Sequence, residues 1–93
     1  MSITVRIPSP LRRLTEGKDV VDADGGTIKD VIENLELNFN GFKERLIDEN
    51  GEMRYFVNVY LNGEDVRFLD GILTKTNKGD EISIVPAVAG GKI

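Results

Sequence analysis

The stretch Thr27-Ile28-Lys29-Asp30-Val31-Ile32-Glu33-Asn34-Leu35 gives the clearest structural signal in the chain. Its apolar residues recur at helical spacing and therefore share one face, while charged and amide side chains occupy the other. Thr27 can cap the N-terminus, and Asp30 stands three residues later, as in a variant of the capping box. We expect an amphipathic helix that buries its apolar face and ends near residues 38–41.

Strands are predicted on both sides of this helix, because apolar and polar residues alternate there with a period of two. The first strand is interrupted by Pro8 and Pro10, which cannot donate to a sheet ladder. Asn62-Gly63 is typical of a tight hairpin turn between two strands. The predicted strands cover residues 3–7, 18–21 (the weakest signal), 55–61, 64–67 and 81–85.

The predicted order is two strands, the helix, an irregular middle, then a strand, a short strand and a last strand. The irregular middle contains a short helical piece over residues 42–47, with Leu46 and Ile47 turned to the core. A sheet with one helix on one face satisfies the rule that domains are built in packed layers. The inward-facing set comprises Ile3, Val5, Ile7, Val57, Val59, Leu61, Ile82, Ile84 and the apolar face of the helix.

This order favours an α+β fold of the β-grasp, or ubiquitin-like, type: a mixed sheet rolled around one main helix. Periodicity alone also allows a ferredoxin-like arrangement, because single-sequence patterns fix elements better than topology.

Composition limits the chemistry that the chain can perform. The chain has 93 residues, 40% hydrophobic and 30% charged, which fits one small ordered domain. The absence of histidine and cysteine excludes imidazole or thiolate metal sites, Cys or His nucleophiles, His general bases and disulfides. Twelve basic against sixteen acidic residues, a net charge of −4, disfavour nucleic acid as a partner.

The sequence shows no membrane or export signal. No run approaches the roughly 20 apolar residues that a membrane span needs. The first residues lack the charged start and apolar run of a signal peptide. We therefore expect a cytoplasmic protein without a membrane partner.

Two short motifs are expected to be turns rather than ligand sites. Residues 48–52, Asp-Glu-Asn-Gly-Glu, lack the ligand spacing and distal glutamate of a calcium loop. Gly25-Gly26 is not followed by the Gly-Lys-Ser/Thr of a phosphate loop. We predict no metal and no bound cofactor on this chain.

The last seven residues, Ala87-Val88-Ala89-Gly90-Gly91-Lys92-Ile93, resist a purely structural interpretation. Residues 87–91 reach at most about 17 Å when extended, enough to enter another protein's active site. Paired glycines have no Cβ and can thread a narrow channel. A frayed terminus is the alternative. We divide the chain into a folded domain, residues 1–86, and a flexible tail, residues 87–93.

The whole chain resembles the small ubiquitin-like sulfur carriers, which include the molybdopterin synthase small subunit and the thiamin-biosynthesis carrier. Within that family it is most similar to the sulfur carriers of cysteine biosynthesis. The resemblance covers most of the 93 residues as an ordered set, whereas Gly-Gly alone is weak evidence. It rests on residues 3–8 (ITVRIP), 56–60 (FVNVY), 64–68 (EDVRF), 79–80 (GD) and 84–91 (IVPAVAGG).

The resemblance implies a protein cosubstrate rather than an enzyme. In the family, an ATP-dependent activating enzyme adenylates the carboxylate of the last glycine, and a sulfur donor converts it to a thiocarboxylate. Gly91 is then the acyl carrier and Gly90 the slender residue before it. The implied acceptor is a pyridoxal-phosphate cysteine synthase, with molybdopterin or a thiolated tRNA base as other products. ATP and pyridoxal phosphate belong to the partner enzymes.

Lys92 and Ile93 depart from the family pattern, which ends at Gly-Gly. An amide at Gly91 cannot be adenylated, so the resemblance implies cleavage between Gly91 and Lys92. Some relatives are trimmed in this way by a zinc metalloprotease of the JAB/JAMM type, and we expect a proprotein of that kind. The alternative is that the two residues reflect drift of the lineage, in which case no trimming is implied.

We expect partners to contact the sheet face that the helix leaves open. Phe56 and Tyr60 are predicted there beside Val85, and exposed aromatics often mark contact sites. The alternative is that loops around residues 68–74 cover both aromatic rings. Arg67 either pairs with a partner's carboxylate or is an ordinary surface arginine, and Val88 of the tail completes the predicted contact set. The acidic balance predicts basic docking patches on partners of a monomeric protein.

Two other functions stay open. A ubiquitin-like modifier would use the activated Gly91 to form an isopeptide with a target lysine. A noncatalytic β-grasp binding module would have an inert tail.

Overall fold

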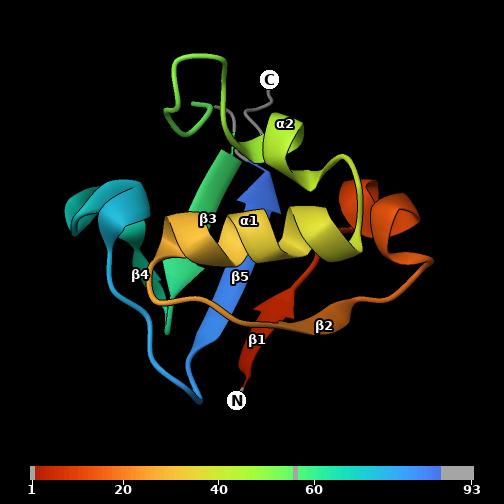
Figure 1. Ribbon diagram of the computed structural model, residues 1–93, viewed down its shortest axis with the longest axis horizontal. Helices are drawn as coiled ribbons and strands as arrows, with labels where there is room; N and C mark the ends of the chain where they lie inside the picture. The colour runs from red at the N-terminus through yellow and green to blue at the C-terminus, as the bar shows by residue number, and fades with distance from the viewer. Residues whose placement is uncertain (1, 56, 87–93) are drawn as a thin grey trace.

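The computed structural model describes residues 2–55 and 57–86, in which five strands form one sheet with helix α1 lying across one face (Figure 1). The strand order is β2-β1-β5-β3-β4. The central strands β1 and β5 are parallel, and the other neighbouring pairs are antiparallel. This order confirms the predicted β-grasp roll and not the ferredoxin-like alternative. The strands are β1 (Ile3–Arg6), β2 (Val20–Ala23), β3 (Val57–Leu61), β4 (Glu64–Asp65) and β5 (Glu81–Pro86).

Helix α1 (Ile28–Asn38) begins and ends where the sequence predicts. The Thr27 hydroxyl accepts a hydrogen bond from the Asp30 N–H at 3.2 Å, which confirms the cap. Its four predicted apolar residues are buried. Gly25 permits the close approach of the preceding turn, because a Cβ there would lie 2.6 Å from the Val31 nitrogen. No helix in the described part of the chain is long and apolar enough to cross a bilayer.

Helix α2 (Phe42–Leu46) confirms the short helical piece predicted over residues 42–47 and ends one residue earlier. Leu46 and Ile47 are buried, as predicted. Phe42 is also fully buried, and its ring meets that of Phe39 edge-on with centroids 6.3 Å apart. The spacing of Phe42 and Leu46, one helical turn, is the sequence signal for this contribution.

The segment between β1 and β2 differs from the prediction. It contains a 3-10 helix, η1 (Ser9–Thr15), where the prediction was only that Pro8 and Pro10 interrupt the first strand. Buried Thr15 donates its hydroxyl to the Lys18 carbonyl at 2.7 Å, and Glu16 takes a left-handed φ of 59°. Lys18, the predicted first residue of the second strand, belongs to this tight turn, so β2 begins at Val20 instead.

The hairpin between β3 and β4 confirms the predicted turn. Asn62 and Gly63 both have positive φ, 51° and 89°, as a type I′ turn requires. Strand β4 is two residues shorter than predicted, because Val66 is buried and the chain coils into two 3-10 turns, η2 (Val66–Phe68) and η3 (Gly71–Leu73). The third predicted strand likewise begins later, at Val57 instead of Tyr55.

Candidate functional site

The end of strand β5 is the point from which the predicted reactive residues continue. Pro86 is the last described residue, and it pairs with Val57 at the start of β3. The predictions about residues 87–93 lie outside the described residues, and so does Phe56. These predictions concern the tail boundary and Val88, Gly90, Gly91 and Lys92. The described part of the candidate site is therefore the surface next to Pro86.

Tyr60 and Val85 lie on the open face of the sheet, opposite α1. Strand β3 alternates buried and half-buried residues, with Asn58 and Tyr60 in the half-buried set. Asn58 pairs with Val85 and Tyr60 with Ser83, so Tyr60 and Val85 are diagonal neighbours on adjacent strands. Val85 keeps 40% of its surface exposed. Their position agrees with the predicted face, and their contact with a partner stays a prediction.

Arg67 has a role within the chain that the sequence did not reveal. Its guanidinium donates to the Asn58 side-chain oxygen at 2.7 Å through Nη1 and to the Arg54 carbonyl at 2.6 Å through Nη2. Its backbone N–H donates to the Asp65 carboxylate at 2.9 Å. Arg67 therefore connects η2 to the start of β3. Its partner Asn58 is the residue of β3 that pairs with Val85 of β5. Arg67 is more than an ordinary surface arginine, and a contact with a partner's carboxylate stays a prediction.

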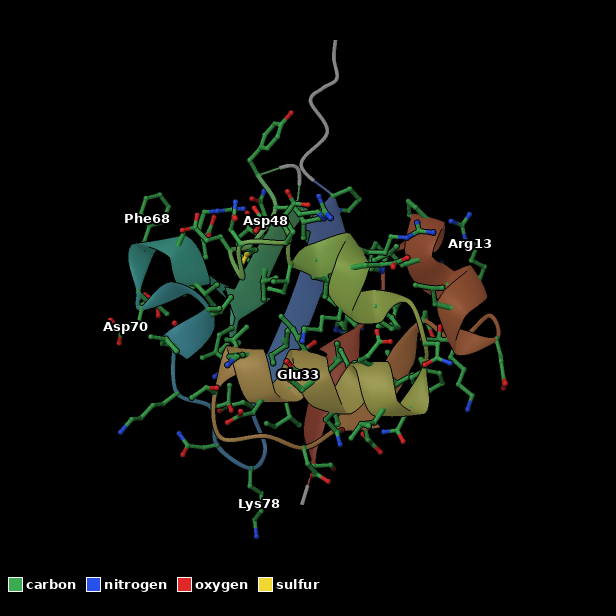
Figure 2. All side chains as sticks on the ribbon, turned by 45° about the horizontal axis from the view of Figure 1, so that its top comes forward. Arg13, Glu33, Asp48, Phe68, Asp70 and Lys78 are labelled. Atoms are coloured by element: carbon green, nitrogen blue, oxygen red, sulfur yellow. The ribbon has the colours of Figure 1, made fainter. Side chains whose placement is uncertain are left out.

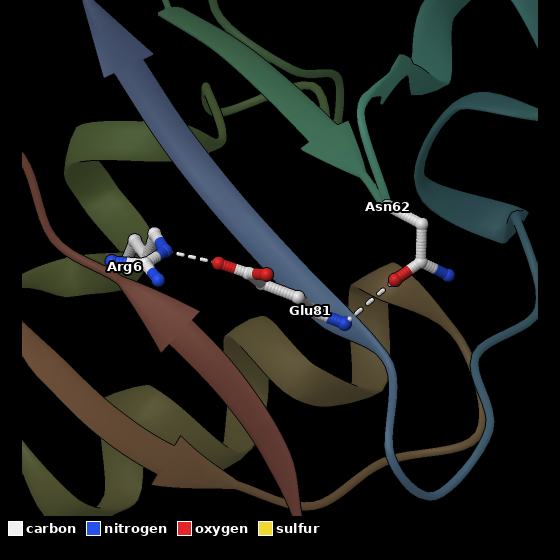
Figure 3. Close-up of polar contacts among 3 residues, drawn as sticks. All are labelled: Arg6, Asn62 and Glu81. Carbon is white, nitrogen blue, oxygen red and sulfur yellow. Dashed lines mark hydrogen bonds and ion pairs between the residues drawn. The ribbon is translucent and has the colours of Figure 1, made fainter.

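Polar contacts fix the other end of β5 (Figure 3). Arg6 and Glu81 form an ion pair across β1 and β5 on the open face. The hydrogen bond and the charge of Glu81 raise the pKa of Arg6 above its ordinary value. The Glu81 N–H donates to the Asn62 side-chain oxygen at 2.9 Å, and the Asn62 N–H donates to the Glu81 carbonyl at 2.8 Å. The β3–β4 turn thus anchors the first residue of β5.

The segment after β4 presents apolar side chains outward. Phe68 is 87% exposed and stands at the periphery of the molecule (Figure 2). Leu69 and Leu73 are 41% and 65% exposed. The Phe68 ring itself therefore faces solvent. The alternative in which loops near residues 68–74 cover both aromatic rings stays open, because Tyr60 is half-buried and Phe56 lies outside the described residues. We call Phe68, Leu69 and Leu73 the apolar lobe.

The acidic run at residues 48–52 forms the predicted turn. The Asp48 carboxylate accepts hydrogen bonds from the backbone N–H groups of Asn50 and Glu52, at 2.9 Å and 3.1 Å. Within residues 2–55 and 57–86, no group of three or more potential ligand side chains is placed to hold a metal ion.

A β-grasp roll whose last strand leads towards Gly90-Gly91 defines a ubiquitin-like protein. The chain belongs to the ThiS family, which it matches over residues 5–91. This membership confirms the resemblance to ubiquitin-like sulfur carriers that the sequence indicated.

Similar proteins include carriers and a modifier. The chain is 48% identical over 93 residues to the sulfur carrier protein CysO of Mycobacterium tuberculosis, covering 98% of this chain and 100% of that protein. It is 39% identical over 94 residues to small archaeal modifier protein 3 of Haloferax volcanii, covering 98% and 100%. A chain in the crystal structure of the Amycolatopsis orientalis BexX/CysO complex superposes with a TM-score of 0.90 at 44% identity, covering 96% of this chain and 99% of that one.

Proposed function

We propose that the protein is a sulfur carrier, a protein cosubstrate that holds sulfur as a thiocarboxylate at Gly91. The observation that carries this proposal is the 48% identity with CysO over the whole length of that carrier. The family match runs through Gly91, the residue that would bear the sulfur. Because the chain has no cysteine, a side-chain persulfide is not available, and the backbone carboxyl group is the remaining place to attach sulfur.

Activation requires a free carboxylate at Gly91. The peptide bond between Gly91 and Lys92 is therefore hydrolysed first, and a JAB/JAMM-type metalloprotease is the class of enzyme that we assign to this step. The water oxygen becomes part of the new Gly91 carboxylate, and the fragment that begins at Lys92 leaves as the amine.

Sulfur is then loaded in two steps by an ATP-dependent activating enzyme and a sulfur donor. A Gly91 carboxylate oxygen attacks the α-phosphorus of ATP, and pyrophosphate leaves. The sulfur nucleophile attacks the acyl carbon of this adenylate, and AMP leaves with the oxygen that joined it. Adenylation is needed because a carboxylate is a poor electrophile, whereas AMP is a good leaving group.

The loaded carrier donates sulfur to an activated electrophile on an acceptor enzyme. We propose cysteine as the product, formed from an activated serine on a pyridoxal-phosphate cysteine synthase. Molybdopterin and a thiolated tRNA base are the other products consistent with the family. We place these steps in the cytoplasm, where ATP is available.

The described fold supports such a carrier mechanically. Strand β5 pairs with β1 over residues 81–83 and with β3 over residues 82–86, so the residue before the tail is held by β3. Arg67 and Asn62 secure the two ends of the neighbouring strand β3. A partner enzyme that draws in the residues after Pro86 therefore pulls against a fixed body.

A ubiquitin-like modifier is the second candidate function. It is favoured by the 39% identity with small archaeal modifier protein 3 over the whole length of that protein. In this function a lysine amine, not a sulfur donor, attacks the activated Gly91.

Intact-mass spectrometry tests the proposal. The chain ending at Gly91 is incubated with purified activating enzyme, MgATP and sulfide, and the expected product has one oxygen replaced by sulfur. A variant ending at Gly90 is the matched control, and it should gain no sulfur if the position of the carboxylate matters. Failure of the Gly91 form to exchange oxygen for sulfur contradicts the carrier function. Isopeptide-linked adducts in its place support the modifier.

A further inference from the structure

The apolar lobe is exposed but rigidly supported. Its three large side chains lie within six residues of chain, at exposures of 87%, 41% and 65%. Two residues of the same segment attach it to the domain: Val66 is fully buried, and Ile72 packs against the core. The Thr74 hydroxyl accepts a hydrogen bond from the Asp70 N–H at 3.0 Å, which fastens the end of the segment. The lobe is thus a preformed surface.

Carboxylates border the lobe. Within residues 64–75 the acidic side chains are Glu64, Asp65 and Asp70, and the basic side chains are Arg67 and Lys75. The Arg67 guanidinium is directed towards Asn58 and the Arg54 carbonyl. A surface with an apolar centre and an acidic rim is complementary to an apolar socket bordered by lysine or arginine.

The lobe is connected to the strand next to β5 through Arg67. Phe68 follows Arg67, which contacts Asn58, and Asn58 is paired with Val85. An enzyme that holds the residues after Pro86 in its active site must approach this end of the sheet, so the lobe is available to it as a second point of attachment.

We propose that the apolar lobe docks into an apolar, basic-rimmed socket on the activating enzyme. This docking assignment rests on the proposed function, because that enzyme must bind the carrier before it adenylates Gly91. The lobe supplies affinity, and the residues after Pro86 supply the reacting group. A second copy of this chain fits the lobe poorly, because two acidic rims would face each other.

Steady-state kinetics of pyrophosphate release test the docking assignment. The purified activating enzyme of the same organism is supplied with MgATP, sulfide and the chain ending at Gly91, either as the parent or as the double variant Phe68→Ser/Leu73→Ser. Truncating a central apolar anchor should raise the KM for the carrier at least about tenfold and leave kcat within about twofold. Asp70→Lys should raise KM more at low salt than at high salt, because it reverses one charge of the rim.

Leu37→Ser is the matched control. Leu37 is 83% exposed near the C-terminal end of α1, whereas the lobe adjoins the N-terminal end, where the Ile28 N–H donates to the Thr74 carbonyl at 3.0 Å. Its KM should equal that of the parent. Circular dichroism melting checks that each variant is folded, as expected for changes at exposed positions.

The outcomes separate the two proposals. An unchanged KM for the double variant, with normal turnover of the parent, overturns the docking assignment and leaves the carrier function standing. An equal rise for Leu37→Ser also overturns it, since the effect would not belong to the lobe. No pyrophosphate release from the parent overturns both proposals. If sedimentation shows a parent dimer that the double variant abolishes, the lobe belongs to a second copy and the docking assignment is wrong.

Discussion

The two faces of the sheet use the same strands for opposite purposes. On the face under α1, every strand of the central group contributes branched aliphatic side chains to one core. On the open face the same strands carry an ion pair between Arg6 and Glu81, the half-buried Tyr60 and the exposed Val85. Neighbouring residues in one strand therefore face a dry interior and solvent in turn. Stability is concentrated on the first face, and contact of the second face with other proteins stays a prediction.

The largest test of this division compares two adjacent residues of β5. Ile84 is 4% exposed on the covered face and Val85 is 40% exposed on the open face. Ile84→Ala should lower the free energy of unfolding by about 2–5 kcal/mol, because it leaves a cavity in the core. Val85→Ala should cost less than about 1 kcal/mol. Urea unfolding measures both, and equal losses would contradict the division.

The second test concerns function on the open face. Val85 and Val20 are similarly exposed, at 40% and 37%, but Val20 lies on the edge strand β2, separated from β5 by β1. Val85→Ser should raise the KM of the activating enzyme by about three- to tenfold, as expected for a contact residue. Val20→Ser should leave KM unchanged. Identical kinetics for the two variants would show that the open face near Pro86 is not a contact surface.

The third test addresses the tie between Arg67 and Asn58. A double-mutant cycle of Arg67→Ala and Asn58→Ala should give a coupling energy of about 0.5–1 kcal/mol in urea unfolding, since the hydrogen bond is exposed. Arg67→Lys should lose most of this coupling, because an ammonium lacks the planar fork that serves two acceptors. Additive single effects would mean that the contact contributes nothing to stability.

The smallest effect is expected from the ion pair on the open face. Both side chains are largely exposed, at 59% for Arg6 and 44% for Glu81, so water and salt screen the pair. Glu81→Gln should shift the urea midpoint only slightly, and the shift should vanish near 1 M salt, where the screening length is about 3 Å. The effect of Ile84→Ala should persist at that salt concentration, and a salt-independent effect of Glu81→Gln would contradict the prediction.

Local patterns predicted the covered face well and the open face poorly. The helix cap at Thr27 and the hairpin at Asn62-Gly63 depend on neighbours within a few residues, so their chemistry is visible in the sequence. The 3-10 helix after Pro8 was missed because it is fixed by the Thr15 hydroxyl inside a local turn rather than by apolar periodicity.

The candidate site was predictable only in part. The alternation of Asn58 and Tyr60 with buried valines placed them on the open face. The Arg67 contacts were invisible, because they join residues 9 and 13 positions apart through side-chain geometry. The lobe was missed for a related reason: exposure of Phe68 depends on the burial of Val66, which turns the chain outward after β4.

The central position of β5 makes folding of the sheet depend on near-complete synthesis of the chain. Strand β5 lies between β1 and β3, so without it the sheet falls into two separate hairpins, β1–β2 and β3–β4. Isolated two-stranded hairpins are marginal in water. A nascent or truncated chain that stops before residue 81 thus has no stable sheet to present, and proteases would remove it. The folded domain therefore forms only after β5, the strand that precedes the diglycine in the sequence, has been synthesised.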